Sequence, residues 1–210
     1  MCTRYYMEMD PALRPIVEEA QKTPLCEKMI RTLARPLKTE GEIRPMNMVP
    51  VIASSRAGVR AVFPMVWGYQ VQGLDRPLVN ARIESAGRKE LWKQGWEGHR
   101  CVIPASYYFE WEHIAMPGGR TRTGKKYAIQ PKGSEVTWLA GLYRIEEYRG
   151  LKHPVFAILT RAPTEDLQRI HDRMPLMLPA AFIDEWIRPE SRPEEIARQA
   201  LTAMVIEEAG

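Results

Sequence analysis

Short apolar runs, each of about the length of a β-strand, dominate the chain between positions 100 and 160. The later runs are separated by turn-forming sequences, PGG at 117–119, PKGS at 131–134 and YRG at 148–150. Runs that alternate with such turns are typical of antiparallel strands. Two earlier stretches, 59–67 and 77–81, have the same texture. We therefore predict a mostly antiparallel, barrel-like β-sheet built from RCVIPA, SYYFEW, KKYAIQ, TWLAGLYRI and HPVFAILT.

Helix signals flank this β-rich region. A polar residue followed by proline predicts helix starts at Asp10-Pro11 and Thr23-Pro24, because such a pair caps and opens a helix. The second helix would place one apolar face inward, formed by Leu25, Met29, Ile30 and Leu33. Further helices are predicted over roughly 84–97, near 163–172, and from the capping box Ser191–Glu194 to about 202, followed by a strand to about 206. No linker interrupts the chain, so we expect one α+β domain over 1–210 with peripheral helices.

Composition places the chain among ordinary globular proteins. It has 210 residues, of which 45% are hydrophobic and 27% charged. No apolar run approaches the roughly 20 residues that a membrane helix needs, and the N-terminus does not resemble a signal peptide. Three cysteines without a CxxC pair argue against a disulfide framework and for a reduced, cytoplasmic setting. We expect no membrane association and a monomer.

Charge is distributed unevenly along the chain. The formal net charge is +4, yet residues 184–210 carry seven acidic and three basic residues, so residues 1–183 carry +8. This imbalance fits a basic body that meets a polyanion, although a solvated surface explains it equally well. Two local features stay open in the same way. The one-turn spacing of Trp92 and Trp96 favours core packing over base stacking. Four basic residues flank the first predicted turn, where they either contact phosphate or form a solvated hairpin tip: Arg120, Arg122, Lys125 and Lys126.

Familiar catalytic motifs are missing from the sequence. There is no GxGxxG, GxxxxGK[ST], HExxH or GxSxG pattern, so nucleotide-binding, zincin and α/β-hydrolase assignments lack support. His99 and Cys101 would share one face of a strand, and His113 follows, but no regular ligand spacing accompanies them. We expect no metal site and no organic cofactor.

Cys2 carries a chemical possibility that an internal cysteine lacks. Removal of an initiator Met before a small residue would leave Cys2 with a free α-amine and a thiol on adjacent carbons. An α-amine has a pKa of about 7.7–8.0, so a fraction of it is neutral at pH 7. A neutral amine attacks an aldehyde to give a Schiff base, and the thiol can then close a five-membered thiazolidine ring.

Polar residues interrupt apolar segments at three further places. Asn80 stands within a strand-like stretch, Glu110 lies between Phe109 and Trp111, and His171 ends a predicted helix. Apolar neighbours raise the pKa of a carboxyl group, which suits a general acid or base. Each residue also has an ordinary explanation, namely Asn80 in a turn, Glu110 in solvent and His171 as a helix cap.

The order of these segments resembles the SRAP family of abasic-site processing proteins. The matching segments are Met1-Cys2-Thr3-Arg4-Tyr5, Asn80-Ala81-Arg82-Ile83-Glu84, Cys101 through Trp111, and Ile170-His171-Asp172-Arg173-Met174-Pro175, with Pro45–Pro50 and Trp67-Gly68 as further similar segments. The resemblance ends near residue 188. Two departures concern the backbone, since Thr3 replaces a glycine of the family pattern and Ser106-Tyr107 replaces Asp-Gly.

The resemblance implies a role for each matching residue. Cys2 would form a covalent link to the aldehyde of a ring-opened abasic site in single-stranded DNA, and this link would shield the lesion in the DNA damage response. Asn80 would orient the Cys2 amine or thiol, Glu110 would act as general acid and base, and His171 would be a second proton relay. The implied DNA contacts are the phosphate clamps Arg4, Arg82 and Arg173 and the wedge or stacking surface Trp67.

Two other functions fit the same residues. In the first, Cys2 is the nucleophile of a self-processing peptidase that cleaves the bond after Met1. In the second, the basic surface binds single-stranded or modified DNA without covalent chemistry, and Cys2 is dispensable.

Overall fold

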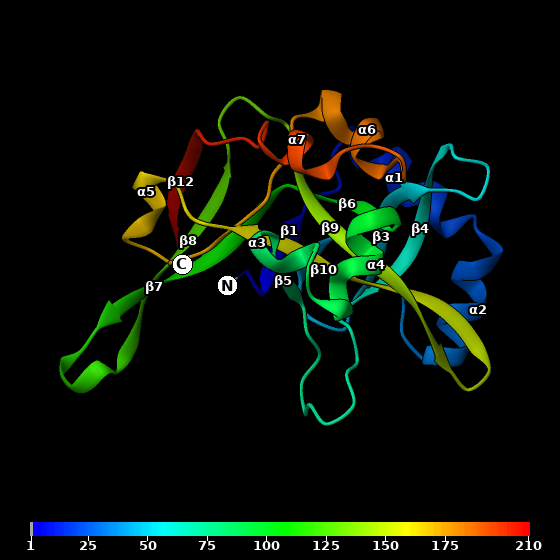
Figure 1. The fold of residues 1–210 in the computed structure, drawn as a ribbon, viewed down its shortest axis with the longest axis horizontal. Coiled ribbons are helices and arrows are strands. Elements are labelled where there is room, and N and C mark those ends of the chain that lie inside the picture. Colours follow the sequence, from blue (N-terminus) through cyan, green and yellow to red (C-terminus); the bar gives the residue numbers. More distant parts are fainter. Residues whose placement is uncertain (1) are drawn as a thin grey trace.

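Five strands close into a small barrel in this computed structural model, which describes residues 2–210 (Figure 1). Each strand pairs with the next around the ring β10-β4-β3-β6-β9, and β9 pairs with β10 again to close it. The β10–β4 pair is parallel, with Val155 opposite Val66, and the other four pairs are antiparallel. The barrel strands are β3 (Met48–Ser54), β4 (Arg60–Trp67), β6 (Arg100–Ala105), β9 (Thr137–Tyr148) and β10 (Leu151–Arg161). The predicted barrel-like, mostly antiparallel α+β fold is confirmed.

A second sheet of five antiparallel strands packs beside the barrel. Its order is β12-β8-β7-β1-β2, and its strands are β1 (Arg4–Met7), β2 (Gly41–Ile43), β7 (Tyr107–Ala115), β8 (Thr121–Pro131) and β12 (Met204–Ala209). Two short strands, β5 (Asn80–Arg82) and β11 (Met174–Pro175), join the barrel by pairing with β10. One hydrophobic cluster contains Tyr5 and Ile129 of the second sheet together with Val51 and Phe156 of the barrel, so the two sheets share a core.

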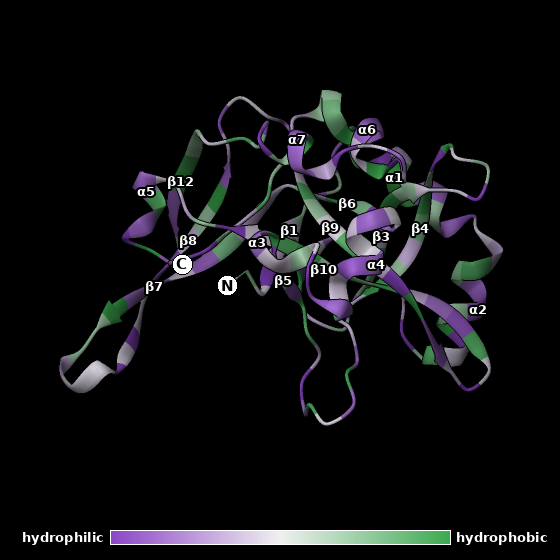
Figure 2. Cartoon of the chain, in the orientation of Figure 1, coloured by the Kyte–Doolittle hydropathy of each residue, from purple (hydrophilic) through white to green (hydrophobic). Residues whose placement is uncertain are grey.

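Short helices cover the outside of these sheets. They are α1 (Arg14–Gln21), α2 (Pro24–Leu33), α3 (Ile83–Ala86), α4 (Glu90–Gly98), α5 (Glu165–Gln168), α6 (Ile183–Ile187) and α7 (Pro193–Ala197), with 3₁₀ turns at Pro117–Gly119 and Ala180–Phe182. Figure 2 shows both hydrophobic and hydrophilic segments on α2, as expected for a helix with one buried face. Thr23 caps α2 as predicted, because its hydroxyl accepts a hydrogen bond from the Cys26 amide. Ile30, however, is 40% exposed and lies off the buried face.

Three helix predictions were wrong in extent. The stretch 84–97 forms two helices, and the chain turns between them at Gly87, where a Cβ atom would lie 2.9 Å from the Trp96 ring. The helix near 163–172 is only the four-residue α5. The capping box at Ser191 does not form, because Arg192 precedes α7 and the Ser191 hydroxyl donates to the Arg188 carbonyl.

Arg100 joins the helical layer to the barrel from within the core. Its side chain is 1% exposed, and its guanidinium group donates to the backbone carbonyls of Trp96 in α4 and Trp186 in α6. A buried guanidinium with several acceptors is satisfied without a carboxylate partner.

Candidate active site

Strand pairing brings the predicted catalytic residues together from four distant segments. β1 pairs with β7, with Arg4 opposite Phe109, so Cys2 lies beside the Glu110–Trp111 end of β7. The Asn80 side chain in β5 reaches Cys2 directly. β7 is also linked to the segment after α5, since the His113 amide donates to the Ile170 carbonyl over 2.9 Å. All four residues therefore lie near the start of β1 and the middle of β7, with Asn80 reaching Cys2 from β5 and His171 lying beside His113.

The Cys2 thiol is buried and protonated. Its side chain is 0% exposed, and its Sγ atom lies 3.6 Å from the Arg4 carbonyl oxygen, to which it donates. Burial raises the pKa of the thiol, and the nearby charge of Glu110 raises it further. The register of β1 on β7, with Arg4 opposite Phe109, places Cys2 and Glu110 near each other. A nucleophilic role for this thiol requires a group that accepts its proton.

Asn80 holds the backbone of Cys2. Its Nδ2 atom donates to the Cys2 carbonyl oxygen over 2.8 Å. The contact is with the carbonyl group of Cys2, whereas the predicted role was to orient its amine or thiol; that role stays a prediction. β5 supplies this side chain because Asn80 pairs with Ile158 of β10, so the barrel fixes its position.

Glu110 is a buried carboxyl group. It is 5% exposed, and its Oε1 atom accepts a hydrogen bond of 3.2 Å from the Trp111 amide. Burial raises the pKa of Glu110, and the charge of Asp172 adds to this effect. The direction agrees with the prediction from its aromatic neighbours. A carboxyl group with a raised pKa exchanges protons closer to neutral pH than an exposed one.

His171 is buried and neutral at pH 7. It is 5% exposed, and burial lowers the pKa of its imidazole to about 4. Its Nδ1 atom accepts a hydrogen bond of 3.0 Å from the Arg173 amide but also lies 2.7 Å from Asp172 Oδ1. The two contacts need opposite protonation of Nδ1. The low pKa leaves the ring with a single hydrogen, and we place it on Nε2 because the Arg173 amide can only donate to Nδ1.

Three residues near this site had no role in the sequence-based prediction. The His113 ring lies 4.2 Å from the His171 ring, centroid to centroid. Burial raises the pKa values of Tyr5 and Tyr108, and the negative charge of an ionised Cys2 would raise both further. The strand register could have revealed the tyrosines, because alternation places them on the core face. The contact between the two histidines depends on the path of the chain after α5, for which the sequence carries no signal.

Two of the four predicted DNA-binding side chains are occupied by contacts within the protein and are not free to contact DNA. Trp67 is 0% exposed, and its indole donates to the Val79 carbonyl. The prediction that it stacks on a base is therefore wrong, because its ring packs against Phe156 in the core. Arg173 binds Glu84 through two contacts of 2.8 Å, and its side chain is 11% exposed. It positions the chain rather than offering a free cation.

Arg82 and Arg4 remain candidate phosphate contacts. Arg82 is exposed and has no ion pair within residues 2–210. Arg4 is 38% exposed, pairs with Glu42 at 3.2 Å, and lies over the Trp111 ring with its guanidinium carbon 5.0 Å from the centroid. A cation stacked on an aromatic ring beside the site is suited to contact the backbone of a nucleic acid.

Both departures from the family pattern are accommodated by the backbone. Thr3 is not among the non-glycine residues with positive φ, so the site does not require glycine there. The Ser106 hydroxyl accepts a hydrogen bond of 2.9 Å from the Glu8 amide. Tyr107 stacks on Tyr6 of the neighbouring strand, with ring centroids 5.1 Å apart. The chain therefore replaces the family's turn residues with local hydrogen bonding and aromatic packing.

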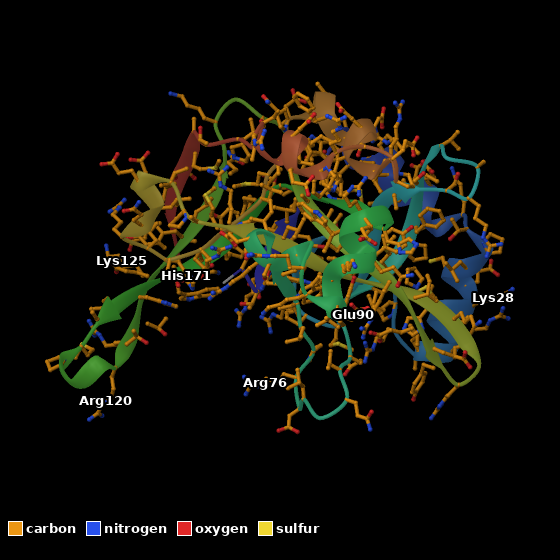
Figure 3. All side chains as sticks on the ribbon, viewed as in Figure 1. Lys28, Arg76, Glu90, Arg120, Lys125 and His171 are labelled. Atoms are coloured by element: carbon orange, nitrogen blue, oxygen red, sulfur yellow. The ribbon has the colours of Figure 1, made fainter. Side chains whose placement is uncertain are left out.

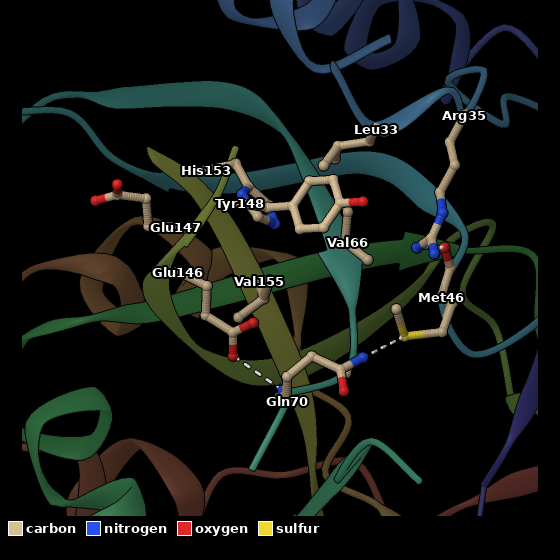
Figure 4. Close-up of a pocket in the computed structure, with 11 residues that line it drawn as sticks. Leu33, Arg35, Met46, Val66, Gln70, Glu146, Glu147, Tyr148, His153 and Val155 are labelled. Atoms are coloured by element: carbon tan, nitrogen blue, oxygen red, sulfur yellow. Dashed lines mark hydrogen bonds between the residues drawn. The ribbon is translucent and has the colours of Figure 1, made fainter. Parts of the chain in front are cut away.

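A cavity of about 440 Å³ lies elsewhere, between α2, β4 and the β9–β10 turn (Figure 4). Leu33, Val66 and Val155 form apolar parts of its wall, with Tyr148 and His153 beside them. None of the four predicted catalytic residues lines it. Within residues 2–210 no group of three His, Cys, Asp or Glu side chains is arranged to hold a metal ion, and no helix there is long and apolar enough to cross a membrane.

Comparison with solved structures places this fold among known ones. A crystal structure of a protein from Bacteroides thetaiotaomicron superposes with a TM-score of 0.71 at 20% identity, covering 100% of this chain and 92% of that one. A phage-related protein from Bordetella bronchiseptica gives a TM-score of 0.68 at 23% identity, covering 99% and 94%. At these identities the likeness concerns the fold alone.

Sequence comparison identifies the family. The family model described as SOS response associated peptidase (SRAP) matches residues 1–209, so the chain belongs to that family. Abasic site processing protein YedK of Escherichia coli is 30% identical over 143 residues, which make up 68% of this chain and 62% of YedK. Abasic site processing protein YoaM of Bacillus subtilis is 29% identical over 125 residues, 59% of this chain and 53% of YoaM. The match thus spans less than two thirds of these relatives.

Proposed function

We propose that this protein processes abasic sites by forming a covalent bond between Cys2 and the lesion in single-stranded DNA. The observation that carries the proposal is the contact of Asn80 with Cys2, together with the electrostatic interaction of Cys2 with Glu110. Side chains from β5 and β7 thereby surround the residue that would begin the chain after Met1 is removed. The names of the relatives from E. coli and B. subtilis support the same lesion as substrate.

The chemistry proceeds through an imine to a ring. The Cys2 amine attacks the aldehyde carbon of the ring-opened sugar, and loss of one water leaves a C=N bond. The Cys2 sulfur then adds to that carbon, and its proton goes to the nitrogen. The product is a five-membered thiazolidine, so the overall change is condensation of one amine, one thiol and one aldehyde with release of one water. No electrons are exchanged with another molecule.

The neighbouring residues move or position the protons of these steps. Glu110 would protonate the departing oxygen when it is neutral and accept the thiol proton when it is ionised, a dual use that its raised pKa favours. His171 would be a second proton relay that stays neutral at pH 7, because burial lowers its pKa to about 4. Asn80 would keep the Cys2 backbone in place while the amine and thiol act in turn.

Intact-protein mass spectrometry after incubation with abasic single-stranded DNA tests the proposal. The native chain without Met1 should gain the mass of the DNA minus one water. Cys2→Ser should leave little stable adduct, because a hydroxyl is the poorer nucleophile. A variant with one residue inserted before Cys2 should leave none, because its amine is then part of a peptide bond. A normal adduct yield from that insertion variant would refute the thiazolidine.

Two buried free cysteines provide matched controls. Cys26 and Cys101 are both buried and form no disulfide, and Cys26→Ala and Cys101→Ala should each keep the adduct. If the native chain without Met1 binds the DNA but forms no adduct, and Cys2→Ser binds it equally well, the protein would instead be a non-covalent reader.

The word peptidase in the family description favours one further function, cleavage after Met1 by the chain itself. Measuring the N-terminal mass of protein produced without methionine aminopeptidase separates the two activities. Retention of Met1 there would exclude self-processing and leave the crosslinking chemistry intact.

A further inference from the structure

The end of the β7–β8 hairpin projects from the body of the molecule as a two-stranded ribbon (Figure 1). We call residues 113–124 the arm. Below the arm, β1 pairs with β7 at residues 107–109, and β12 pairs with β8 at residues 126–131. Within the arm, β7 and β8 pair only with each other, with His113 opposite Thr123 and Ala115 opposite Thr121. No other strand of the described chain supports it.

The charges of the arm are both positive and lie near its tip. The arm contains two arginines and no aspartate or glutamate, so its formal net charge is +2 with His113 neutral. Arg120 and Arg122 are exposed, and neither forms an ion pair in the described part of the chain. Arg122 alternates along β8 with Thr121 and Thr123, so it points to the opposite face of the ribbon from the two threonines. An isolated two-stranded ribbon is only marginally stable in water. Packing within the chain therefore does not explain the length of the arm, whereas binding of its tip to a partner would.

The base of the arm is anchored at the candidate active site. The His113 amide donates to the Ile170 carbonyl over 2.9 Å, and the His113 ring contacts the His171 ring. At the other strand, Lys125 pairs with Glu208 at 2.6 Å and fixes the ribbon to β12. In Figure 3 His171 lies at the root of the hairpin and Arg120 at its tip, so a strand that passes His171 can continue along the arm.

We propose that the arm binds the phosphate groups of the single strand on one side of the lesion, through Arg120 and Arg122. The inference rests on the proposed function, because that function supplies the strand at His171. It assigns the arm a part in affinity and in the direction of binding, with no part in the covalent step. Guanidinium groups contact phosphate through two parallel hydrogen bonds, so two arginines suit two successive phosphates.

A DNA probe that cannot be crosslinked isolates this contact. A tetrahydrofuran abasic analogue lacks the aldehyde, so its dissociation constant, measured by fluorescence anisotropy, reports binding alone. Arg120→Ala/Arg122→Ala should raise the Kd roughly tenfold at 0.1 M salt and lower the salt slope by about 1.4, at about 0.7 for each lost contact. Arg120→Lys/Arg122→Lys should retain most of the slope. The melting temperature should stay close to that of the native chain, because the arm lies outside the core.

Two exposed cations at the opposite end of the molecule supply the matched control. Lys28 lies far from Arg120 in Figure 3, and Lys28 and Arg31 both lie exposed on α2. Lys28→Ala/Arg31→Ala removes the same charge and should leave the slope unchanged. Equal effects of the two double variants would refute a local contact and leave only net charge.

Probes lengthened stepwise on either the 5′ or the 3′ side of the analogue show on which side of the lesion the strand contacts the arm. The Kd difference between the native chain and the arm variant should appear only for extension on one side. A loss confined to probes with a complementary strand would overturn the single-strand assignment. If the arm variant binds the analogue normally while the native chain still forms the Cys2-dependent crosslink, only the phosphate contact of the arm is refuted. If the native chain forms no crosslink, the proposed function is refuted.

Discussion

At the scale of single residues, the candidate site depends on two titratable groups that burial shifts toward their neutral forms. The Glu110 carboxyl has a raised pKa and the His171 imidazole has a pKa lowered to about 4. Both shifts have the same first cause, since burial removes water from whichever form is charged. The acid and the base can therefore coexist uncharged, a state from which either can begin a proton transfer.

Glu110→Gln keeps the shape of the side chain and an oxygen acceptor for the Trp111 amide, but removes its proton chemistry. We expect crosslinking to slow by roughly 10²–10⁴. A carboxyl group whose pKa is raised on folding contributes stability below its unfolded pKa and loses it as pH rises through the folded pKa. The melting temperature of the variant relative to the native chain should therefore be higher at pH 8 than at pH 4. An unchanged rate with a large loss of melting temperature would make Glu110 structural.

His171 gives the opposite pH dependence. Its folded pKa of about 4 lies below the unfolded value, so its contribution to stability is present above about pH 6.5 and is lost as pH falls toward 4. His171→Gln should remove this part of the acid destabilisation and slow crosslinking. Thermal unfolding between pH 4 and 7 measures the first effect, and a native-like loss of stability on acidification would contradict it.

The ring of His113 supports the ring of His171, and two substitutions separate packing from charge. His113→Phe preserves an aromatic contact, whereas His113→Ala removes it. Besides burial, the charge of His113 lowers the pKa of His171, so both variants should move the acid limb of the crosslinking rate toward higher pH. Only the alanine variant should also lose rate at the plateau. Identical pH–rate profiles for the native chain and both variants would show that the contact has no functional effect.

At the scale of elements, strands were predicted better than helices because their signals are local. The β10 stretch reads as a continuous apolar run between turns, and the structure buries it on both sides. The helix predicted over 84–97 broke because Trp96 packs over Gly87, a tertiary contact with no counterpart in apolar periodicity. Ser191 failed as a cap because its hydroxyl bonds Arg188 instead. Which helices are cut short is decided by packing between segments far apart in the chain.

Barrel closure depends on Gly141 of β9, which lies between β6 and β10. A Cβ atom there would lie 2.6 Å from Ile103 Cδ1 and 2.9 Å from the Ala157 carbonyl oxygen. Because the second neighbour is backbone, Gly141→Ala should destabilise the fold by roughly 1–3 kcal/mol through overpacking. Gly98→Ala is the control, since its nearest atom is 4.0 Å away. Urea unfolding measures both, and equal midpoints for the two variants would contradict the close approach.

At the scale of the whole molecule, the fold converts sequence motifs into one site and leaves part of the basic charge free. Cys2, Asn80, Glu110 and His171 were predicted together because the motifs carry them, and strand pairing explains why they meet. The outer residues were predicted less well. Trp67 and Arg173 share the motifs, yet a core position and an ion pair with Glu84 occupy them. Membership of a motif therefore does not by itself tell which residues face a ligand, because contacts within the chain already occupy Trp67 and Arg173.

Arg82 and Arg173 therefore form a matched pair for testing how the charge of +8 over residues 1–183 acts. Arg82 is exposed without an ion pair among the described residues, so Arg82→Ala should weaken binding to single-stranded DNA and lower the salt slope by about 0.7. Arg173 is neutralised by Glu84 and also donates to the Thr160 carbonyl, so Arg173→Ala should lower the melting temperature instead. Its salt slope should match the native chain. If both variants lose the same slope and keep the same melting temperature, DNA affinity depends on net charge alone. The charge of Arg173 would then contribute as much as that of Arg82, which requires its ion pair with Glu84 to open when DNA binds.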